Sequence, residues 1–169
     1  MAKIIILVAS SVNNQELGLK LQELALKENC EVELINLVDI KLPLYSTVEE
    51  EKNGIPRSAV DLTQKILASK AFIIVAPEYN GVMPPVLNNA TAWITRATED
   101  WREAFGEKIV ALATHSGSGG AKGLQAMRIH FGHLGANILA RELLTNYTKD
   151  LNEESALAII KSLVRLSEA

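Results

Sequence analysis

The residues best suited to chemistry lie in a polar and aromatic loop, Glu-Tyr-Asn-Gly-Val-Met, at positions 78–83 between prolines. An unbroken apolar run over 71–76 precedes the loop and predicts a strand buried on both faces. Pro84 and Pro85 follow it and suit the first turn of a helix, where the N–H groups that proline lacks would have no partner. A rigid loop between strand and helix, with free backbone donors and a tyrosine, can hold a flat polar ring. A plain connecting turn explains these residues equally well.

A second group of polar residues lies in the loop at 9–15, ahead of a predicted helix. Ser10, Ser11, Asn13 and Asn14 are residue types that commonly cap a helix N-terminus. Four short donors at the start of a helix also suit a phosphate group, because backbone N–H groups and the helix dipole attract an anion there. Capping and phosphate binding therefore both stay open for this loop.

A glycine-rich loop occupies positions 115–120. It contains, in order, His115, Ser116, Gly117, Ser118, Gly119 and Gly120. Its glycines permit either a tight turn with positive φ or close approach of the backbone to a flat ligand. The spacing matches neither a dinucleotide-binding fingerprint nor a phosphate-binding P-loop. The histidine could lie near a ligand, but a loop histidine more often has no such role.

The elements that position these loops alternate between strand and helix along the chain. Apolar runs and alternating patterns predict strands at 3–9, 31–37, 71–76, 108–114 and 136–140. Three- and four-residue apolar spacing predicts helices at 14–29, 57–69, 84–97, 121–134 and 152–168, the last beginning at Asn152. Residues 38–57 form the longest irregular connection, and a loop of this length is usually functional or mobile.

This alternation predicts an α/β fold, a doubly wound five-stranded parallel sheet with helices on both faces. Among the topologies that right-handed crossovers permit, we expect the flavodoxin-like strand order 2-1-3-4-5. That order places the loops after the first, third and fourth strands side by side, at the switch point where ligands bind in such sheets. These are the three loops with unusual composition, so the pattern predicts a binding site there.

The signature of a known family is visible in the second loop and the helix after it. Pro77-Glu78-Tyr79-Asn80-Gly81, then Pro84, Leu87-x-Asn89-Ala90 and Trp93, resembles the signature of the NADPH-dependent FMN reductase family. That family is flavodoxin-like and includes flavin, quinone, azo-dye and chromate reductases. Two features differ from its usual pattern. Pro85 replaces a glycine, and the first loop is shortened and lacks an arginine and a second serine.

The resemblance implies an FMN-dependent oxidoreductase that passes hydride from NADPH or NADH to bound FMN and on to a small-molecule acceptor. Such an acceptor would be a flavin, quinone, azo compound or metal oxyanion. The implied cofactor-binding residues are Ser10, Ser11, Asn13, Asn14, Pro77, Glu78, Tyr79, Asn80, Gly81, Ser116, Gly117, Ser118, Gly119 and Gly120. No side chain is nominated as a catalytic acid or base. The resemblance also implies a homodimer or homotetramer, and we expect residues 38–57 and the helix after Pro84 at its interface.

Composition limits the classes of partner. The chain has 169 residues, 48% of them hydrophobic, which predicts one domain over 1–169 with a large core. Its net charge of −3 and the lack of a basic cluster argue against nucleic acid or an anionic membrane as partner. The N-terminal apolar run is too short for a signal peptide and continues as a strand, so we expect a cytoplasmic protein. The single Cys30 excludes an internal disulfide and predicts a buried thiol.

The other side chains carry weaker signals. His130 and His133 are one turn apart, but no carboxylate or cysteine cluster completes a metal shell. Arg96 and Arg128 are expected in surface or interface ion pairs, and Trp93 in the core or an interface. Two other functions stay open on sequence alone. They are a one-electron carrier of the flavodoxin type and a flavin-poor binding or regulatory protein on the same fold.

Overall fold

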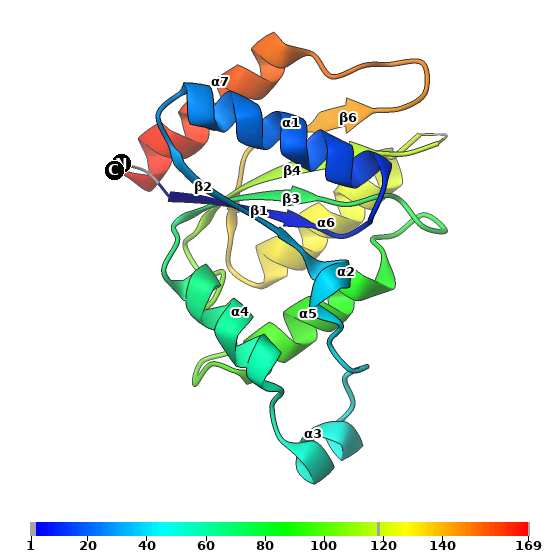
Figure 1. The fold of residues 1–169 in the computed structure, drawn as a ribbon, viewed down its shortest axis with the longest axis vertical. Helices are drawn as coiled ribbons and strands as arrows, with labels where there is room; N and C mark the ends of the chain where they lie inside the picture. Colours follow the sequence, from blue (N-terminus) through cyan, green and yellow to red (C-terminus); the bar gives the residue numbers. More distant parts are fainter. Residues whose placement is uncertain (1–2, 118, 169) are drawn as a thin grey trace.

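The computed structural model describes residues 3–117 and 119–168. Its centre is a parallel sheet in the order β2-β1-β3-β4-β5, with β6 also paired to β4 (Figure 1). The strands are β1 (Lys3–Val8), β2 (Glu31–Asn36), β3 (Ala71–Val75), β4 (Ile109–His115), β5 (Asn137–Ile138) and β6 (Leu143–Thr145). The predicted flavodoxin-like strand order is therefore confirmed.

Long helices cover both faces of the sheet. They are α1 (Asn13–Lys27), α4 (Arg57–Leu67), α5 (Pro85–Arg96), α6 (Ala121–His133) and α7 (Glu153–Ser167). Helices α1 and α7 lie on one face, and α4, α5 and α6 lie on the other (Figure 1). No helix within the described residues combines the length and the apolar character needed to cross a membrane.

Two apolar layers enclose the central strands. In β1, Ile4 and Ile6 pack into the layer with α1 and α7, whereas Ile5 and Leu7 pack into the layer with α4, α5 and α6. All four side chains are fully buried. Because both faces of the strand are covered, its sequence is continuously apolar and does not alternate. Cys30 is also buried, as predicted.

The fifth strand predicted at 136–140 is wrong in extent, because β5 covers only Asn137–Ile138 and a further short strand, β6, follows at Leu143–Thr145. β5 pairs with the start of β4 and β6 pairs with its end. Between them the Arg128 guanidinium donates to the Leu139 carbonyl at 2.8 Å and pairs with the Glu142 carboxylate. The Leu139 carbonyl is thus bound by a side chain, while the Leu139 N–H still donates to the Val110 carbonyl at 2.9 Å. The sheet has six strands and not five. The contact with Glu142 confirms the ion pair predicted for Arg128.

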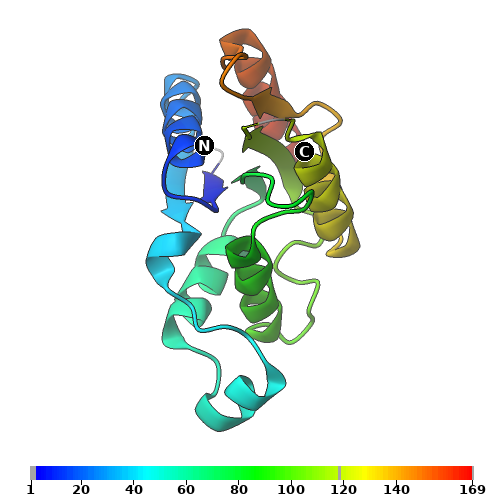
Figure 2. The same ribbon diagram turned by 90° about the vertical axis from the view of Figure 1, so that its right-hand side faces the viewer.

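The connection predicted to be irregular over 38–57 contains two short helices, so that prediction is wrong in part. They are α2 (Leu37–Ile40) and α3 (Thr47–Asn53). The Asn36 side chain caps α2 by accepting from the Val38 N–H, and the Ser46 side chain caps α3 by accepting from the Glu49 N–H. Ser46-x-x-Glu49 is a recognisable N-terminal capping pattern. Residues 41–56, here called the arm, extend away from the sheet and carry α3 at their far end (Figure 2).

Candidate functional site

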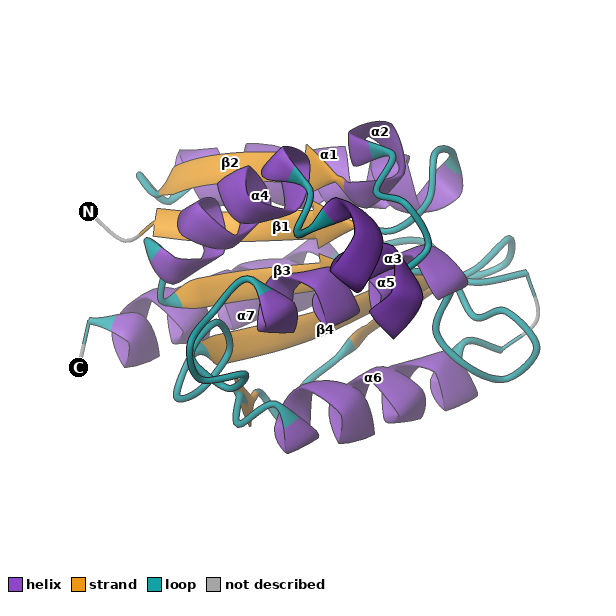
Figure 3. Cartoon of the chain, turned by 90° about the horizontal axis from the view of Figure 1, so that it is seen from below, coloured by secondary structure: helices purple, strands orange, loops and turns teal. Residues whose placement is uncertain are grey.

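The loops that follow β1, β3 and β4 emerge together at one edge of the sheet. Their strands are parallel neighbours, and the ladder continues past the strand ends. The Ala9 N–H donates to the Val75 carbonyl at 2.9 Å, and the Ala76 N–H donates to the Ala113 carbonyl at 3.1 Å. Figure 3 shows these loops gathered at the same ends of the strands. We call this edge the rim.

The second loop of the rim, residues 76–84, folds into a tight hairpin. Tyr79 and Val82 exchange two backbone hydrogen bonds of 2.9 and 3.1 Å. Between them, Asn80 and Gly81 have φ values of 53° and 81°. Two successive positive φ values are typical of a type I′ turn, which Asn-Gly favours, so the dipeptide was the sequence signal for this hairpin. The side chains of Tyr79 and Val82 are 49% and 54% exposed.

Only part of this loop's backbone is available to a ligand. Pro77 has no N–H, the Glu78 N–H donates to a serine hydroxyl of the third loop at 3.1 Å, and the Tyr79 N–H is used in the hairpin. Among the described contacts of the turn, the N–H groups of Asn80 and Gly81 have no protein acceptor. The predicted free backbone donors are thus found in the turn and not in the residues before it.

The Glu78 side chain points toward α6. Its Oε2 accepts a hydrogen bond from the Gly123 N–H at 3.1 Å. The two residues pack so closely that a Cβ at Gly123 would lie 3.0 Å from the Glu78 Cβ. This predicted cofactor-binding residue therefore uses its carboxylate within the protein.

A recess of about 460 Å³ lies beside the hairpin and the first turn of α5. Its lining consists of Tyr79, Asn80, Val82, Met83, Pro85 and Asn88. Aliphatic and aromatic side chains form most of this surface, and two asparagines supply polar groups. A recess of this kind suits a flat, largely apolar molecule with a few polar atoms.

The first loop, residues 9–12, leads into α1, and no side chain caps the N-terminus of this helix. Val12 occupies the N-cap position and makes no side-chain hydrogen bond to the first turn, so of the two alternatives left open for this loop, helix capping is not found. Asn14 is instead 2% exposed. Its Oδ1 accepts from the His115 N–H at 2.8 Å and its Nδ2 donates to the His115 carbonyl at 2.9 Å. This two-point contact ties the start of α1 to the third loop.

Two more predicted residues of the first loop, Ser10 and Asn13, are held by partners far away in sequence. The Ser10 carbonyl accepts from Asn36 Nδ2 at 3.1 Å, and Asn13 Nδ2 donates to the Tyr147 hydroxyl at 3.3 Å. Ser11 is exposed. The supporting residues Asn36 and Tyr147 were missed because they lie 26 and 134 positions from their partners, and no local pattern marks such pairs.

The third loop begins with residues bonded to β6. Ser116 is 6% exposed, and its N–H donates to the Thr145 carbonyl at 3.1 Å. The His115 Nδ1 lies 3.1 Å from the Thr145 Oγ1. The imidazole also meets the Tyr147 ring edge-on, with 5.3 Å between ring centroids. Both residues are therefore anchored by the protein.

The glycines that follow differ in their roles. Gly120 has φ of 81°, and a Cβ there would lie 2.8 Å from the Thr114 Cγ2, so this position requires glycine. Gly117 and Gly119 are exposed. A Cβ at Gly119 would meet nothing within 4 Å, which leaves its backbone open to a ligand. The prediction for Ser118 lies outside the described residues.

The second half of the family signature contacts the arm and not the rim. Asn89 Oδ1 accepts from the Tyr45 N–H at 2.8 Å. Asn89 Nδ2 and Trp93 Nε1 both donate to the Pro43 carbonyl, at 3.0 and 2.7 Å. Trp93 is fully buried, as predicted, and the Tyr45 ring packs edge-on against it with 5.1 Å between ring centroids. These residues of α5 fasten the arm to the body of the protein.

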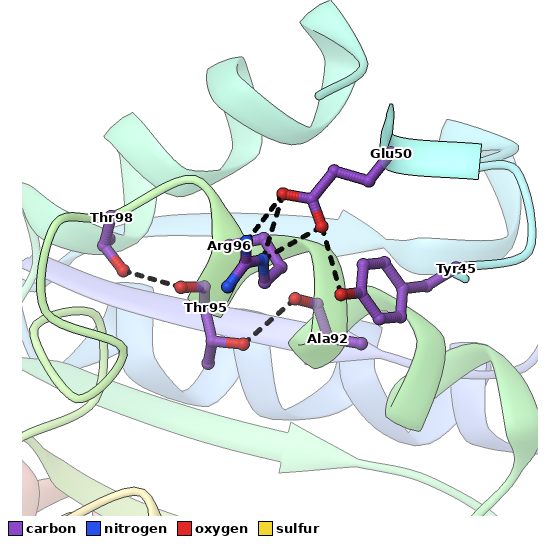
Figure 4. Close-up of polar contacts among 6 residues, drawn as sticks. All are labelled: Tyr45, Glu50, Ala92, Thr95, Arg96 and Thr98. Carbon is purple, nitrogen blue, oxygen red and sulfur yellow. Dashed lines mark hydrogen bonds and ion pairs between the residues drawn. The ribbon is translucent and has the colours of Figure 1, made fainter. Parts of the chain in front are cut away.

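An ion pair completes this attachment (Figure 4). Arg96 donates to both carboxylate oxygens of Glu50, with distances of 2.9 to 3.0 Å, and the Tyr45 hydroxyl donates to Glu50 Oε2 at 3.1 Å. Hydrogen bonding to Arg96 lowers the pKa of Glu50. Desolvation and then the hydrogen bond to Glu50 raise the pKa of Tyr45. The ion pair predicted for Arg96 is confirmed.

The two helix-6 histidines form no metal site. Within residues 3–117 and 119–168, no group of three or more His, Cys, Asp and Glu side chains could hold a metal ion. His130 Nε2 lies 2.9 Å from the Thr91 Oγ1, and burial lowers the pKa of this histidine. His133 stacks on Trp101 with 5.2 Å between ring centroids. In these contacts both histidines bind residues outside the three loops of the rim.

Comparison with known proteins shows which family the sequence matches and which proteins resemble it. The sequence matches the NADPH-dependent FMN reductase family over residues 2–150. An uncharacterized protein of Mycoplasma pneumoniae (strain ATCC 29342 / M129 / Subtype 1), the MG342 homolog, is 27% identical over 165 residues, which cover 95% of this chain and 97% of the relative. A probable NADPH:quinone oxidoreductase 2 of Oryza sativa subsp. japonica is 33% identical over 108 residues, which cover 61% of this chain and 50% of the relative.

A solved structure shows the same fold. FerB, a flavoenzyme NAD(P)H:(acceptor) oxidoreductase from Paracoccus denitrificans, superposes with a TM-score of 0.75 at 21% identity, and the match covers 99% of this chain and 96% of that chain. The family match spans most of the sequence, and the signature residues lie on the hairpin and on α5, where the fold uses them. This chain therefore belongs to the NADPH-dependent FMN reductase family.

Proposed function

We propose that this protein is an FMN-dependent NAD(P)H oxidoreductase that reduces a small-molecule acceptor in the cytoplasm. The observation that carries the proposal is the set of backbone groups at the rim that no side chain occupies. Among the residues that the structure describes, no side chain caps the N-terminus of α1 and no acceptor meets the N–H groups at 80–81. A Cβ built at Gly119 would likewise meet nothing within 4 Å. Such groups suit a phosphate and a flat polar ring without requiring an arginine.

The residues at the rim fit FMN in two parts. The start of α1, with Ser10, Ser11 and Asn13 beside it, would hold the phosphate. The turn at 80–81 and the glycines at 117 and 119 would lie along the ring through their backbone groups. Glu78, Asn14 and Ser116 would act indirectly, since their polar atoms already bind other parts of the rim.

Bound FMN would supply the hydride-transfer chemistry, and the protein would supply binding and orientation. We assign no side chain as a general acid or base. The one rim histidine, His115, is held by Thr145 and Tyr147, which orient it within the protein. Unpaired N–H groups of the turn would favour negative charge on a ring placed against them.

The recess beside the hairpin supports a quinone as the class of acceptor. Its mixture of apolar side chains with two asparagines suits a flat ring that carries carbonyl oxygens. Matching proteins of Oryza sativa and of Escherichia coli (strain K12) bear the names probable NADPH:quinone oxidoreductase 2 and quinone reductase. The aligned residues make up 50% and 38% of those two proteins.

We also propose a homodimer or homotetramer in which the arm contacts a second copy. Leu44 and Val48 are apolar residues of the arm that are 80% and 69% exposed. The polar attachment to α5 holds the arm in one position, which favours a defined contact. Light scattering of the purified protein tests this, and a monomer at micromolar concentration would contradict it.

Anaerobic visible spectroscopy tests the proposed activity. Protein loaded with FMN is expected to lose its flavin absorbance when NADPH or NADH is added, and to regain it when a benzoquinone follows. Retention of the colour with both nucleotides would favour a one-electron carrier. A protein that takes up no FMN would favour a binding or regulatory role.

A further inference from the structure

Helix α6 has no N-terminal cap of its own, and a residue from another loop closes it. Its N-cap is Gly120, which has no side chain, and its first turn contains no acidic residue. Glu78 of the second loop supplies the acceptor, with Oε2 at 3.1 Å from the Gly123 N–H. A carboxylate at a helix N-terminus is favoured both by the hydrogen bond and by the helix dipole.

The backbone is shaped to receive this carboxylate. A Cβ at Gly123 would lie 3.0 Å from the Glu78 Cβ and 3.2 Å from its Cα, so glycine at 123 allows the loop to approach the helix closely. On its other side, the Glu78 N–H donates to Ser116 Oγ at 3.1 Å. Glu78 thus binds both the start of the third loop and the helix that follows it.

The start of α1 lacks an equivalent group. Val12 at its N-cap makes no side-chain bond to the first turn, and the acidic residue of that turn, Glu16, is exposed. Two helix N-termini therefore meet the same rim, and the protein's own carboxylate occupies one of them.

We propose that Glu78 is a positioning residue of the cofactor site. Its carboxylate locks the second loop onto the third and occupies the positive end of α6, which leaves the start of α1 as the place for a ligand phosphate. This inference rests on the proposed function for its ligand. The contacts of Glu78 with Gly123 and Ser116, here called the lock, are a property of the protein without flavin.

Amide hydrogen exchange in the protein without flavin tests the lock. Glu78→Ala is expected to speed exchange at Gly123 and Leu124 about tenfold or more, the effect of losing one charge-assisted hydrogen bond. Glu78→Gln keeps an acceptor of the same length and is expected to restore most of the protection. Glu23→Gln, on the exposed face of α1, is the control and should leave both amides unchanged. Equal protection in Glu78→Ala and the parent would overturn the lock.

Two ligands test the consequence for the site. Inorganic phosphate is expected to shift amide resonances at 13–16 in the parent, and in Glu78→Ala at Gly123 as well. A shift of Gly123 in the parent would overturn the role assigned to the carboxylate.

FMN is expected to bind Glu78→Ala about tenfold more weakly than the parent, with partial recovery in Glu78→Gln. Faster exchange with unchanged FMN affinity would overturn the positioning role. Failure of the parent to bind FMN would instead remove the proposed function, while the exchange result would still decide the lock.

Discussion

The two halves of the segment 77–96 have opposite characters, although both belong to one family signature. In the hairpin half, Tyr79 and Val82 lie at the surface around a turn whose two central N–H groups have no acceptor among the described residues. The helical half places Leu87, Ala90 and Trp93 in the core, and the polar groups of Asn89 and Trp93 bind the arm. One signature therefore joins an exposed turn to residues that fasten the arm, and we expect mutations in the two parts to have different effects.

Trp93→Ala is expected to have the largest effect of the changes considered, on stability alone. Removing a fully buried tryptophan costs about 3–5 kcal/mol, and the hydrogen bond to the Pro43 carbonyl is lost with it. Urea unfolding measures this loss, while FMN affinity per folded molecule should stay within about twofold. Trp101→Ala is the control, because Trp101 is 42% exposed and should cost far less. A large loss of FMN affinity in folded Trp93→Ala would break the separation of the two halves.

Asn14→Ala is expected to reduce both stability and cofactor binding, since Asn14 joins two loops of the rim. It would leave the His115 N–H and carbonyl without their present partners, at a cost of about 1–3 kcal/mol. Urea unfolding and an FMN titration measure the two effects. Normal FMN affinity in a destabilised variant would show that the contact serves the fold only.

Glycine substitutions compare the hairpin with the arm directly. Gly81 and Gly54 have φ values of 81° and 73°, and no atom lies within 3.4 Å of a Cβ built at either position. Gly81→Ala should therefore cost roughly 1–2 kcal/mol of backbone strain. Gly54→Ala should cost more, because Gly54 also has a ψ of −173°, a conformation that is essentially restricted to glycine. Only Gly81→Ala is expected to weaken FMN binding, because only that turn belongs to the rim. Equal FMN affinity in both variants would exclude the turn from the site.

The ion pair of the arm gives the smallest effect, and it depends on pH. Arg96 lowers the pKa of Glu50 below its ordinary value of 4.5 in the folded protein. The stabilisation is therefore present above about pH 4.5 and is lost as the pH falls through the folded-state pKa. Unfolding measured from pH 7 to pH 3 should show a smaller decline for Arg96→Gln than for the parent. An identical pH profile would mean that the pair contributes nothing measurable.

The fold was predictable because its signals are local. The apolar run at 71–76 and the prolines at 84–85 define a strand and a helix start without reference to the rest of the chain. Two predictions about the fold were wrong, the extent of the fifth strand and the irregular connection at 38–57. The Arg128 guanidinium binds the Leu139 carbonyl between β5 and β6, a contact that no periodicity reveals. The capping pattern at Ser46 was readable, but it lay inside a connection whose length suggested a loop.

The position of the candidate site in the fold could be predicted from the sequence, but the contacts of its individual side chains could not. Composition and strand order brought the three loops to one rim. The uses of individual side chains depended on contacts across 101 positions for Asn14 and 45 positions for Glu78, and these determine which polar groups the protein consumes. The sequence predicted the same cofactor-binding role for Glu78 and Asn80. In the structure the Glu78 carboxylate binds the Gly123 N–H, whereas Asn80 is exposed.

Mapping FMN onto the protein by amide chemical shifts tests the central claim most directly. Titration of FMN into flavin-free protein is expected to perturb the start of α1, the turn at 80–81 and the glycines at 117 and 119 together, with saturation at one FMN per chain. Perturbations confined to another surface, or none at millimolar FMN, would contradict the account.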